Sequence, residues 1–187
     1  MSTQDARSVR SRQALLDAGI ELLLRNPAAT LSEIAAHANV GRATLYRQFE
    51  SKEQLIQELA IESLEMTSAV IAPVKNRKLS AKATLEEIFK AVMPLADKYH
   101  FLLSIWNIAE KDDEVIAIYN QQLTELASLI ERGKKEGTIN KNLDTSWIVC
   151  VIDSLIYSGW WMMGNTGMSA ANASAHSIET LFAGISK

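Results

Sequence analysis

Two helix-capping signatures, close together in the first third of the chain, confine the residues between them to short helices. In Thr30-Leu31-Ser32-Glu33 the threonine hydroxyl can accept a hydrogen bond from the Glu33 amide, while the Glu33 carboxylate accepts one from the Thr30 amide. Ser51-Lys52-Glu53-Gln54 repeats this signature and predicts the start of a longer helix. Between them, Asn39-Val40-Gly41 predicts a turn, because asparagine tolerates a left-handed backbone and glycine can cap the next helix. The segment therefore predicts two short helices, one from Leu31 and one over residues 42–49.

The rest of the chain also has a helical pattern. Its 187 residues include only 8 Gly and 3 Pro, too few turn-formers for the many short strands of a sandwich or barrel. Apolar residues at helical spacing predict a helix over residues 10–25, another from Lys52 to about Ala72, and a third from Ser80 or Thr84 to Lys98, kinked at Pro94. A short apolar segment over residues 101–109 precedes predicted helices over 113–136 (capped by Asp112 or Asp113), 145–163 (capped by Asp144) and 169–185. We expect an all-α protein.

Charge and cysteine content exclude several classes of protein. The single cysteine, Cys150, cannot form an internal disulfide, and no cysteine pair is present to hold zinc or an iron-sulfur cluster. A net charge of -3 argues against a basic surface for indiscriminate nucleic-acid binding. Residues 1–12 lack the apolar segment of a secretory signal, and the longest apolar stretch, residues 147–163, is shorter than the roughly 20 residues of a spanning helix and contains Asp153. We therefore expect a cytoplasmic protein without metal or cofactor.

The two short helices have the arrangement of a helix-turn-helix unit. Ala35, Val40 and Leu45 are spaced so that all three can meet in one small core. This leaves one face of the second helix unburied, with side chains suited to a DNA groove: arginine can bind guanine O6 and N7 as a fork, and glutamine can bind adenine N6 and N7. Threonine and tyrosine hydroxyls suit phosphates. Lys52 lies in the first turn of the next helix, where free amide groups already favour a phosphate.

At these residues the chain resembles the TetR family of bacterial transcriptional regulators. The matching pattern is Thr30-x3-Ile34-Ala35-x2-Ala38-x-Val40-x3-Thr44-Leu45-Tyr46-x2-Phe49-x-Ser51-Lys52-Glu53-x-Leu55, and the resemblance covers roughly residues 10–57. It departs from the common pattern at Asn39, where a turn glycine is usual, and at Gly41, where a serine-like cap is usual. Both residues suit the backbone, but position 41 has no hydroxyl to offer to a phosphate.

The resemblance implies an all-helical homodimer with an N-terminal helix-turn-helix DNA-binding domain, which we expect over residues 1–50, and a C-terminal effector-binding and dimerisation domain over residues 51–187. Because a long helix joins the DNA-binding part to a C-terminal part rich in apolar and aromatic residues, we expect a repressor that binds a palindromic operator and is released by a small apolar or aromatic effector. The DNA contacts of the family fall on Ser32, Arg42, Ala43, Thr44, Tyr46, Arg47, Gln48 and Lys52.

Aromatic and methionine side chains gather in the C-terminal part and could enclose a cavity between helices. Asp153 interrupts an apolar helix, where a carboxylate is costly unless paired, so it could meet a ligand hydroxyl or amine, or equally a local hydrogen bond or an interface. Plain core packing is the alternative at each position. The candidate pocket residues are Met66, Phe89, Met93, Phe101, Trp106, Tyr119, Asp153, Trp160 and Met163.

The last two helices are the dimer interface that the resemblance implies. Small residues in both would let two helices approach closely, and aliphatic residues would supply burial. The alternative is that these helices pack onto their own subunit. The candidate interface residues are Ile148, Ile152, Leu155, Gly159, Ile178 and Leu181.

Other classes of function fit less well. The three histidines lie on separate segments, and no metalloprotease, phosphate-loop or serine-nucleophile motif is present, so we do not expect an enzyme. An effector-independent DNA-binding protein remains an alternative, as does a helical ligand-binding protein without a DNA partner. The N-terminal arginines Arg7, Arg10 and Arg12 could follow a minor groove or form a solvated terminus.

Overall fold

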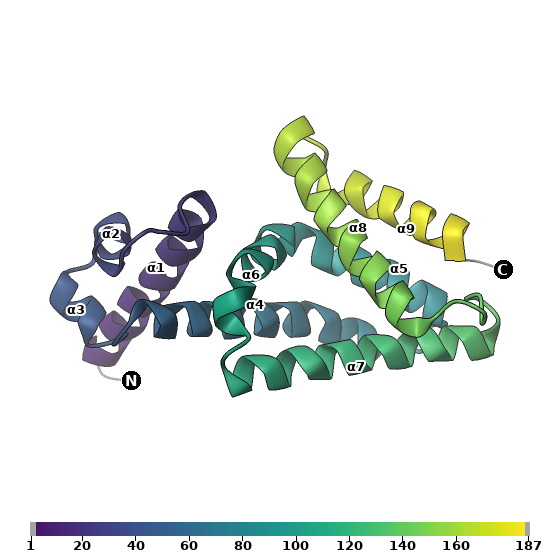
Figure 1. Cartoon of the computed structure of the whole chain (residues 1–187), viewed down its shortest axis with the longest axis horizontal. Coiled ribbons are helices and arrows are strands. Elements are labelled where there is room, and N and C mark those ends of the chain that lie inside the picture. Colours follow the sequence, from purple (N-terminus) through teal and green to yellow (C-terminus); the bar gives the residue numbers. More distant parts are fainter. Residues whose placement is uncertain (1–2, 186–187) are drawn as a thin grey trace. The chain divides into compact units, whose positions relative to one another are not determined.

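The computed structural model describes residues 3–185, and every regular element in that range is helical (Figure 1). The all-α prediction is therefore confirmed. The elements are α1 (Thr3–Arg25), α2 (Leu31–His37), α3 (Arg42–Tyr46), α4 (Lys52–Lys75), α5 (Ala81–Val92), the 3₁₀ turn η1 (Met93–Leu95), α6 (Ala96–Ala109), α7 (Asp113–Glu136), α8 (Thr145–Thr166) and α9 (Ala170–Ile185).

The predicted caps form as expected. The Thr30 hydroxyl accepts a hydrogen bond from the Glu33 amide at 3.3 Å, and the Glu33 carboxylate accepts one from the Thr30 amide at 2.6 Å. That backbone hydrogen bond, followed by the one from the Thr30 hydroxyl, holds the pKa of Glu33 below its ordinary value. Asn39 adopts the left-handed backbone with φ of 53°. Asp144 accepts a hydrogen bond from the Trp147 amide and starts α8.

Several predicted helix ends are wrong. α1 begins at Thr3 rather than at residue 10, and α3 ends at Tyr46 rather than at residue 49, where the chain turns tightly before the Ser51 cap. α4 continues through Pro73 to Lys75, because a proline in the last turn removes one backbone hydrogen bond with little helix left to disrupt. Pro94 does more than kink a helix: the 3₁₀ turn η1 ends α5, and the segment from Ala96 to Ala109 is one helix, α6.

The chain forms two compact units, which we describe separately. Unit 1 comprises the residues up to Ser63 together with Phe101–Ile116, and unit 2 comprises Leu64–His100 together with the residues from Ala117 onwards. In unit 1, α1, α2 and α3 pack on one another, and Leu15, Leu45 and Phe49 are fully buried. The predicted functional boundary between residues 50 and 51 stays a prediction.

The core of unit 2 is formed by α5, η1, α8 and α9, which pack on one another. Phe89 and Met93 are almost completely buried in it, together with Ile148 and Ile152 of α8. Among the described residues, α8 alone has the length and apolar composition of a membrane-spanning helix. The buried isoleucines of α8 show a second reason for this composition, because one side of the helix belongs to a protein core.

Close packing at Gly159 leads to a prediction about stability. A Cβ atom at this position would lie 2.8 Å from Cε of Met93, whose side chain has no exposed surface to move into. We expect Gly159→Ala to lower the free energy of unfolding by about 1–3 kcal/mol and Tm by about 2–4 °C for each kcal/mol. Gly164→Ala is the matched control on the same helix: no atom lies within 4 Å of its Cβ position, so higher helix propensity should leave Tm unchanged or raise it. Equal Tm values for the two variants in thermal unfolding would contradict this packing.

Candidate functional site

The backbone of the α2–α3 unit is held by local hydrogen bonds. The Val40 amide donates to the Ala35 carbonyl at 2.9 Å, and the Leu45 amide donates to the Gly41 carbonyl at 3.1 Å. Gly41 caps α3 without a side-chain hydrogen bond, as expected from the absence of a hydroxyl at this position. Ile34, Ala35 and Leu45 are buried, so the opposite side of α3 is left at the surface.

A hydrogen bond between a histidine and a carboxylate joins α2 to α1. His37 Nε2 lies 3.0 Å from a carboxylate oxygen of Glu21. This hydrogen bond, followed by the charge interaction with the same histidine, lowers the pKa of Glu21. α2 is therefore tied to α1 through its last turn as well as through its buried residues.

Predicted DNA contacts form one surface around α3, which we call the recognition face and define as Arg42, Ala43, Thr44, Tyr46, Arg47 and Gln48. Arg42, Ala43, Tyr46 and Arg47 are exposed, and Thr44 and Gln48 are half-buried. Tyr46 is 54% exposed, so this aromatic ring is not part of the core. The Arg47 guanidinium donates to the Thr44 hydroxyl at 3.1 Å, and the Gln48 amide donates to the Ser8 carbonyl of α1 at 3.2 Å. The face thus offers two exposed arginines and a glutamine whose amide already has one partner.

Lys52 and Arg12 both lie in unit 1 but are placed differently. The Lys52 ammonium donates to the Pro27 carbonyl at 2.7 Å and is half-buried at the start of α4. Arg12 forms an ion pair with Glu58, and its guanidinium carbon lies 5.0 Å from the centroid of the Phe49 ring. Arg12 therefore joins α1 to α4 instead of lying at a solvated terminus. The side chain of Arg7 lies outside the described residues.

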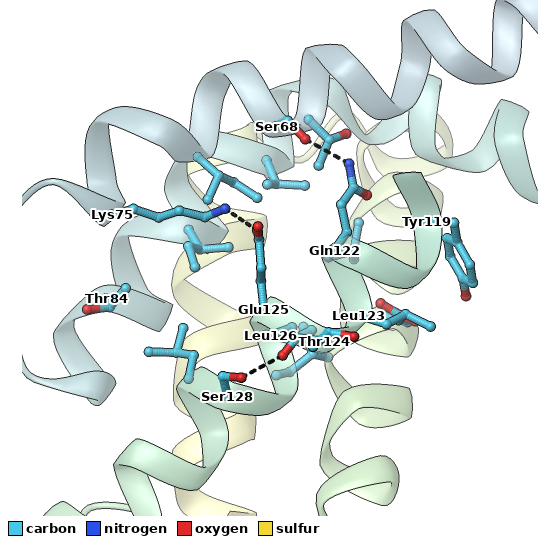
Figure 2. A pocket seen from close by; sticks show the side chains of 18 of the residues that line it. Ser68, Lys75, Thr84, Tyr119, Gln122, Leu123, Thr124, Glu125, Leu126 and Ser128 are labelled. Carbon is cyan, nitrogen blue, oxygen red and sulfur yellow. Dashed lines mark hydrogen bonds and ion pairs between the residues drawn. The ribbon is translucent and has the colours of Figure 1, made fainter. Parts of the chain in front are cut away.

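A cavity of about 580 Å³ lies in unit 2 between α4, α5, α7 and α8 (Figure 2). Its volume is in the range of about 300–1,000 Å³ that is usual for small-molecule sites. Each of the four helices contributes apolar wall: Ile71 from α4, Ile88 from α5, Leu126 from α7 and Ile152 from α8. The wall is mostly apolar, so the cavity suits a ligand with a hydrophobic body.

Two polar links join α4 to α7 beside this cavity (Figure 2). The Gln122 amide donates to the Ser68 hydroxyl at 3.0 Å and to the Leu64 carbonyl at 2.8 Å. Lys75 forms an ion pair with Glu125, and this contact, followed by the hydrogen bond from Gln121, lowers the pKa of Glu125. A ligand that displaces α7 side chains would therefore also act on α4.

One side of α8 is exposed along almost its whole length. Trp147, Cys150, Ser154, Tyr157 and Trp161, which we call the α8 outer face, are all exposed and follow one another at alternating spacings of three and four residues. Trp147 is 62% exposed and Trp161 47%. This spacing places them on one stripe of the helix, as at a seam between two packed helices.

Comparison with known proteins decides the family. Residues 15–59, which contain α2, α3 and the start of α4, match the family model described as bacterial regulatory proteins, tetR family. Over these residues the chain matches the TetR family. TetR-family regulators are soluble DNA-binding transcription factors rather than enzymes.

Curated relatives of the chain are named as repressors. It is 30% identical over 94 residues to the HTH-type transcriptional repressor LfrR of Mycolicibacterium smegmatis, a match that spans 50% of each chain. It is 26% identical over 183 residues to the probable acrEF/envCD operon repressor of Escherichia coli K12, covering 87% of this chain and 80% of that one. The chain thus spans half the length of the first of these relatives.

Solved structures share the fold over nearly the whole chain. LfrR from Mycobacterium smegmatis in complex with proflavine is 24% identical, with 97% of this chain and 99% of that chain covered and a TM-score of 0.78. The ketosteroid transcriptional regulator KstR2 of Mycobacterium tuberculosis is 19% identical, with 94% and 95% covered and a TM-score of 0.81. The TetR fold therefore extends beyond the matched N-terminal residues.

The wall of the cavity includes few of the side chains selected from sequence. Tyr119 and Asp153 line it. Phe89 and Met93 belong to the core of unit 2, and Phe101 and Trp106 belong to unit 1. The Trp160 ring stacks on His100 at 3.5 Å between centroids, and neither Met66 nor Met163 lines this cavity.

The cavity wall also contains polar and aliphatic residues that the sequence analysis did not select. Gln122, Glu125 and Arg132 line the cavity from α7, next to Leu126 and Leu129. The sequence signal was a polar residue inside the apolar stripe of a helix, as at Gln122. Aromatic content was a poor guide, because some large rings fill cores, as Phe89 and Phe101 do, and others lie exposed at the surface, as Trp147 and Trp161 do.

Four of the six candidate interface residues are buried inside their own chain. Ile148, Ile152 and Leu181 are at most 2% exposed, and Gly159 packs against Met93. Side chains without exposed surface cannot contact a partner, whereas Leu155 and Ile178 are half-buried. The large exposed apolar side chains of α8 instead lie on the α8 outer face.

Proposed function

We propose that this chain is a ligand-responsive transcriptional repressor that binds a palindromic operator as a homodimer in the cytoplasm and is released by a small apolar or aromatic effector. The observation that carries the proposal is the connectivity of α4. This helix begins at Lys52, directly after the recognition face, and its later residues Ser68 and Ile71 form part of the cavity wall. One helix thus belongs both to the DNA-binding part and to the ligand cavity.

The predicted DNA contacts support binding by α3 in a major groove. Arg42 and Arg47 are exposed and carry the fork that guanine binds, and Tyr46 presents its hydroxyl at the surface. Ser32 lies half-buried on α2 and Lys52 at the start of α4, where helix termini suit phosphate contacts. Lys52 would exchange its hydrogen bond to the Pro27 carbonyl for a phosphate oxygen.

The effector would act by moving α4. Ligand in the cavity would disturb the links from Gln122 and Glu125 of α7 to Leu64, Ser68 and Lys75 of α4. The two recognition helices of a dimer must be about 34–36 Å apart, or a multiple of that, to enter successive major grooves. A tenfold loss of operator affinity requires about 1.4 kcal/mol of coupling between the two sites. LfrR, with its bound proflavine, is a related protein that takes a small molecule.

Selection of bound fragments from random duplexes tests the proposal. We expect enrichment of a two-fold symmetric sequence whose half-sites are about 10–10.5 bp apart or a multiple of that. Adding fractions of a metabolite pool to the bound complex should release the DNA in at least one fraction. Enrichment without symmetry would contradict operator binding by a dimer, and DNA that no fraction releases would favour an effector-independent DNA-binding protein.

A further inference from the structure

Charged side chains of the cavity wall already have partners within the chain. The described cations that line the cavity are each paired with a carboxylate. The pairs are Lys75 with Glu125, Arg77 with Glu87 at 2.6 Å, and Arg132 with Glu136 at 3.7 Å. Asp153, another carboxylate of the wall, also interacts within the chain. A charged ligand would therefore have to displace one of these partners and would lose its own hydration beside apolar side chains.

Several hydroxyl groups of the wall use their protons on the backbone. Thr84 donates to the Ser80 carbonyl at 2.8 Å, and Thr124 donates to the Asn120 carbonyl at 2.8 Å. Ser128 donates to the Thr124 carbonyl at 2.9 Å (Figure 2). Each acceptor lies four residues earlier in the chain, which is the usual local partner of a helical hydroxyl. These hydroxyls can accept a hydrogen bond from a ligand but have no proton left to donate.

The Ser68 hydroxyl is bonded differently. Its oxygen accepts a hydrogen bond from the Gln122 amide at 3.0 Å (Figure 2). Within the part of the chain that the structure describes, no hydrogen bond uses the proton of this hydroxyl. A hydroxyl has one proton to donate in addition to the lone pairs of its oxygen. Ser68 therefore offers the cavity a hydrogen-bond donor.

The Gln122 amide offers an acceptor beside that donor. Its nitrogen lies 2.8 Å from the Leu64 carbonyl, and a carbonyl can only accept, so this contact fixes which end of the amide is the nitrogen. The other end, Oε1, receives no hydrogen bond from any described residue. Oε1 is nevertheless not a buried atom without a partner, so it keeps accessible surface on a side chain that lines the cavity.

We infer that the effector of this chain is an uncharged compound with a hydrophobic body and a terminal hydroxyl, which is bound by Ser68 and Gln122. The inference rests on the proposed function, because it names the chemical class of the molecule that would release the operator. The ligand oxygen accepts from the Ser68 hydroxyl, and the ligand hydroxyl donates to Gln122 Oε1. The hydrophobic body lies along Ile71, Leu126 and Ile152. Because Ser68 and Gln122 also link α4 to α7, a ligand bound to them acts directly on α4.

Four probes with one ring system test the ligand class. Naphthalen-2-ylmethanol carries the hydroxyl, and 2-ethylnaphthalene replaces it with a methyl group. Naphthalen-2-ylmethylamine is a cation at neutral pH, and naphthalene-2-carboxylate is an anion. Equilibrium dialysis of the full chain, without DNA, should give the alcohol a Kd about tenfold or more below those of the other three. The hydrocarbon leaves both wall groups unpaired, and the two ions lose hydration without gaining an unpaired opposite charge.

Three variants test the role of the Ser68 proton. Ser68→Ala removes it but keeps the hydrogen bond from Gln122 to the Leu64 carbonyl, so the Kd of the alcohol should rise about 3–10-fold and that of 2-ethylnaphthalene should not rise. Ser68→Thr restores a hydroxyl and should restore the low Kd. Ser128→Ala is the matched control, because it removes a cavity hydroxyl whose proton is already bonded, and it should leave the Kd of the alcohol unchanged. Retained binding of 2-ethylnaphthalene by Ser68→Ala establishes that the cavity is intact in this variant.

Several results would overturn the inference. They are equal Kd values for the alcohol and 2-ethylnaphthalene, tighter binding of either ion, no binding of any probe, an unchanged Kd of the alcohol in Ser68→Ala, or the same loss in Ser128→Ala. None of these results affects the proposed repressor function, because selection of operator duplexes is measured on the same preparations without the probes. Failure of that selection, with the alcohol preference intact, would instead remove the repressor and keep the ligand class.

Discussion

Replacing Trp161 with arginine is expected to give a monomer whose affinity for operator DNA is about 10²–10⁴-fold lower than that of the parent. Trp161 is 47% exposed on the α8 outer face, in line with Trp147 and Tyr157. Exposed aromatic side chains at this spacing are typical of a helix that packs against a partner helix. An unpaired arginine buried in such an interface would lose several kcal/mol of hydration. In a dimer, binding of one subunit to its half-site raises the effective concentration of the other subunit at the second half-site. A monomer lacks this contribution.

Sedimentation velocity measures the oligomeric state, and titration of the selected duplex measures the affinity. Leu103→Arg is the matched control, because Leu103 is a 49% exposed apolar side chain on α6 and does not belong to the α8 outer face. We expect it to remain dimeric and to keep its operator affinity. If the Trp161→Arg variant remained dimeric, the α8 outer face would not be the dimer interface. If the variant were monomeric but kept its operator affinity, the dimer would not contribute to operator binding.

Local signals in the sequence predicted the N-terminal part in detail because they act over a few residues. The Thr30–Glu33 capping box and the left-handed Asn39 need only neighbouring backbone, so a single sequence is enough to locate them. The end of α3 was harder to predict from the sequence. Gln48 and Phe49 continue the helical pattern, yet the chain leaves the helix after Tyr46 to reach the next cap.

The cavity and the exposed face of α8 depend on contacts between helices that are distant in the sequence. The spacing of apolar residues along one helix does not predict these contacts. Apolar residues occur all round α8, so the pattern could not tell that Ile148 and Ile152 point into the core while Trp147 and Trp161 point outward. Small residues were expected at a dimer interface, but Gly159 is small because Met93 packs against it. Asp153 could be selected for the cavity wall because a carboxylate in an apolar helix needs a specific reason to be there.

Replacing Arg47 with alanine is expected to weaken binding to the operator by about 2–6 kcal/mol, since one bidentate contact to a base is worth about 1–3 kcal/mol and a symmetric dimer loses it in both half-sites. Arg47 is exposed at the end of α3, where its guanidinium is oriented by the Thr44 hydroxyl at 3.1 Å. Binding to unrelated duplexes should change little, because a base contact adds affinity only where the correct base is present. Competition titrations with the selected duplex and a scrambled one measure both quantities.

Two variants separate base recognition from charge. Arg47→Lys keeps the positive charge but lacks the planar fork, so it should lose most of the preference for the selected duplex and keep the non-specific affinity. Lys52→Ala should weaken both duplexes alike and lower the slope of log affinity against log salt by about one for each phosphate that is no longer neutralised. If Arg47→Ala weakened both duplexes equally, or if Arg47→Lys bound the selected duplex like the parent, Arg47 would be a phosphate contact, and base recognition would fall to Arg42 and to Gln48 once released from Ser8.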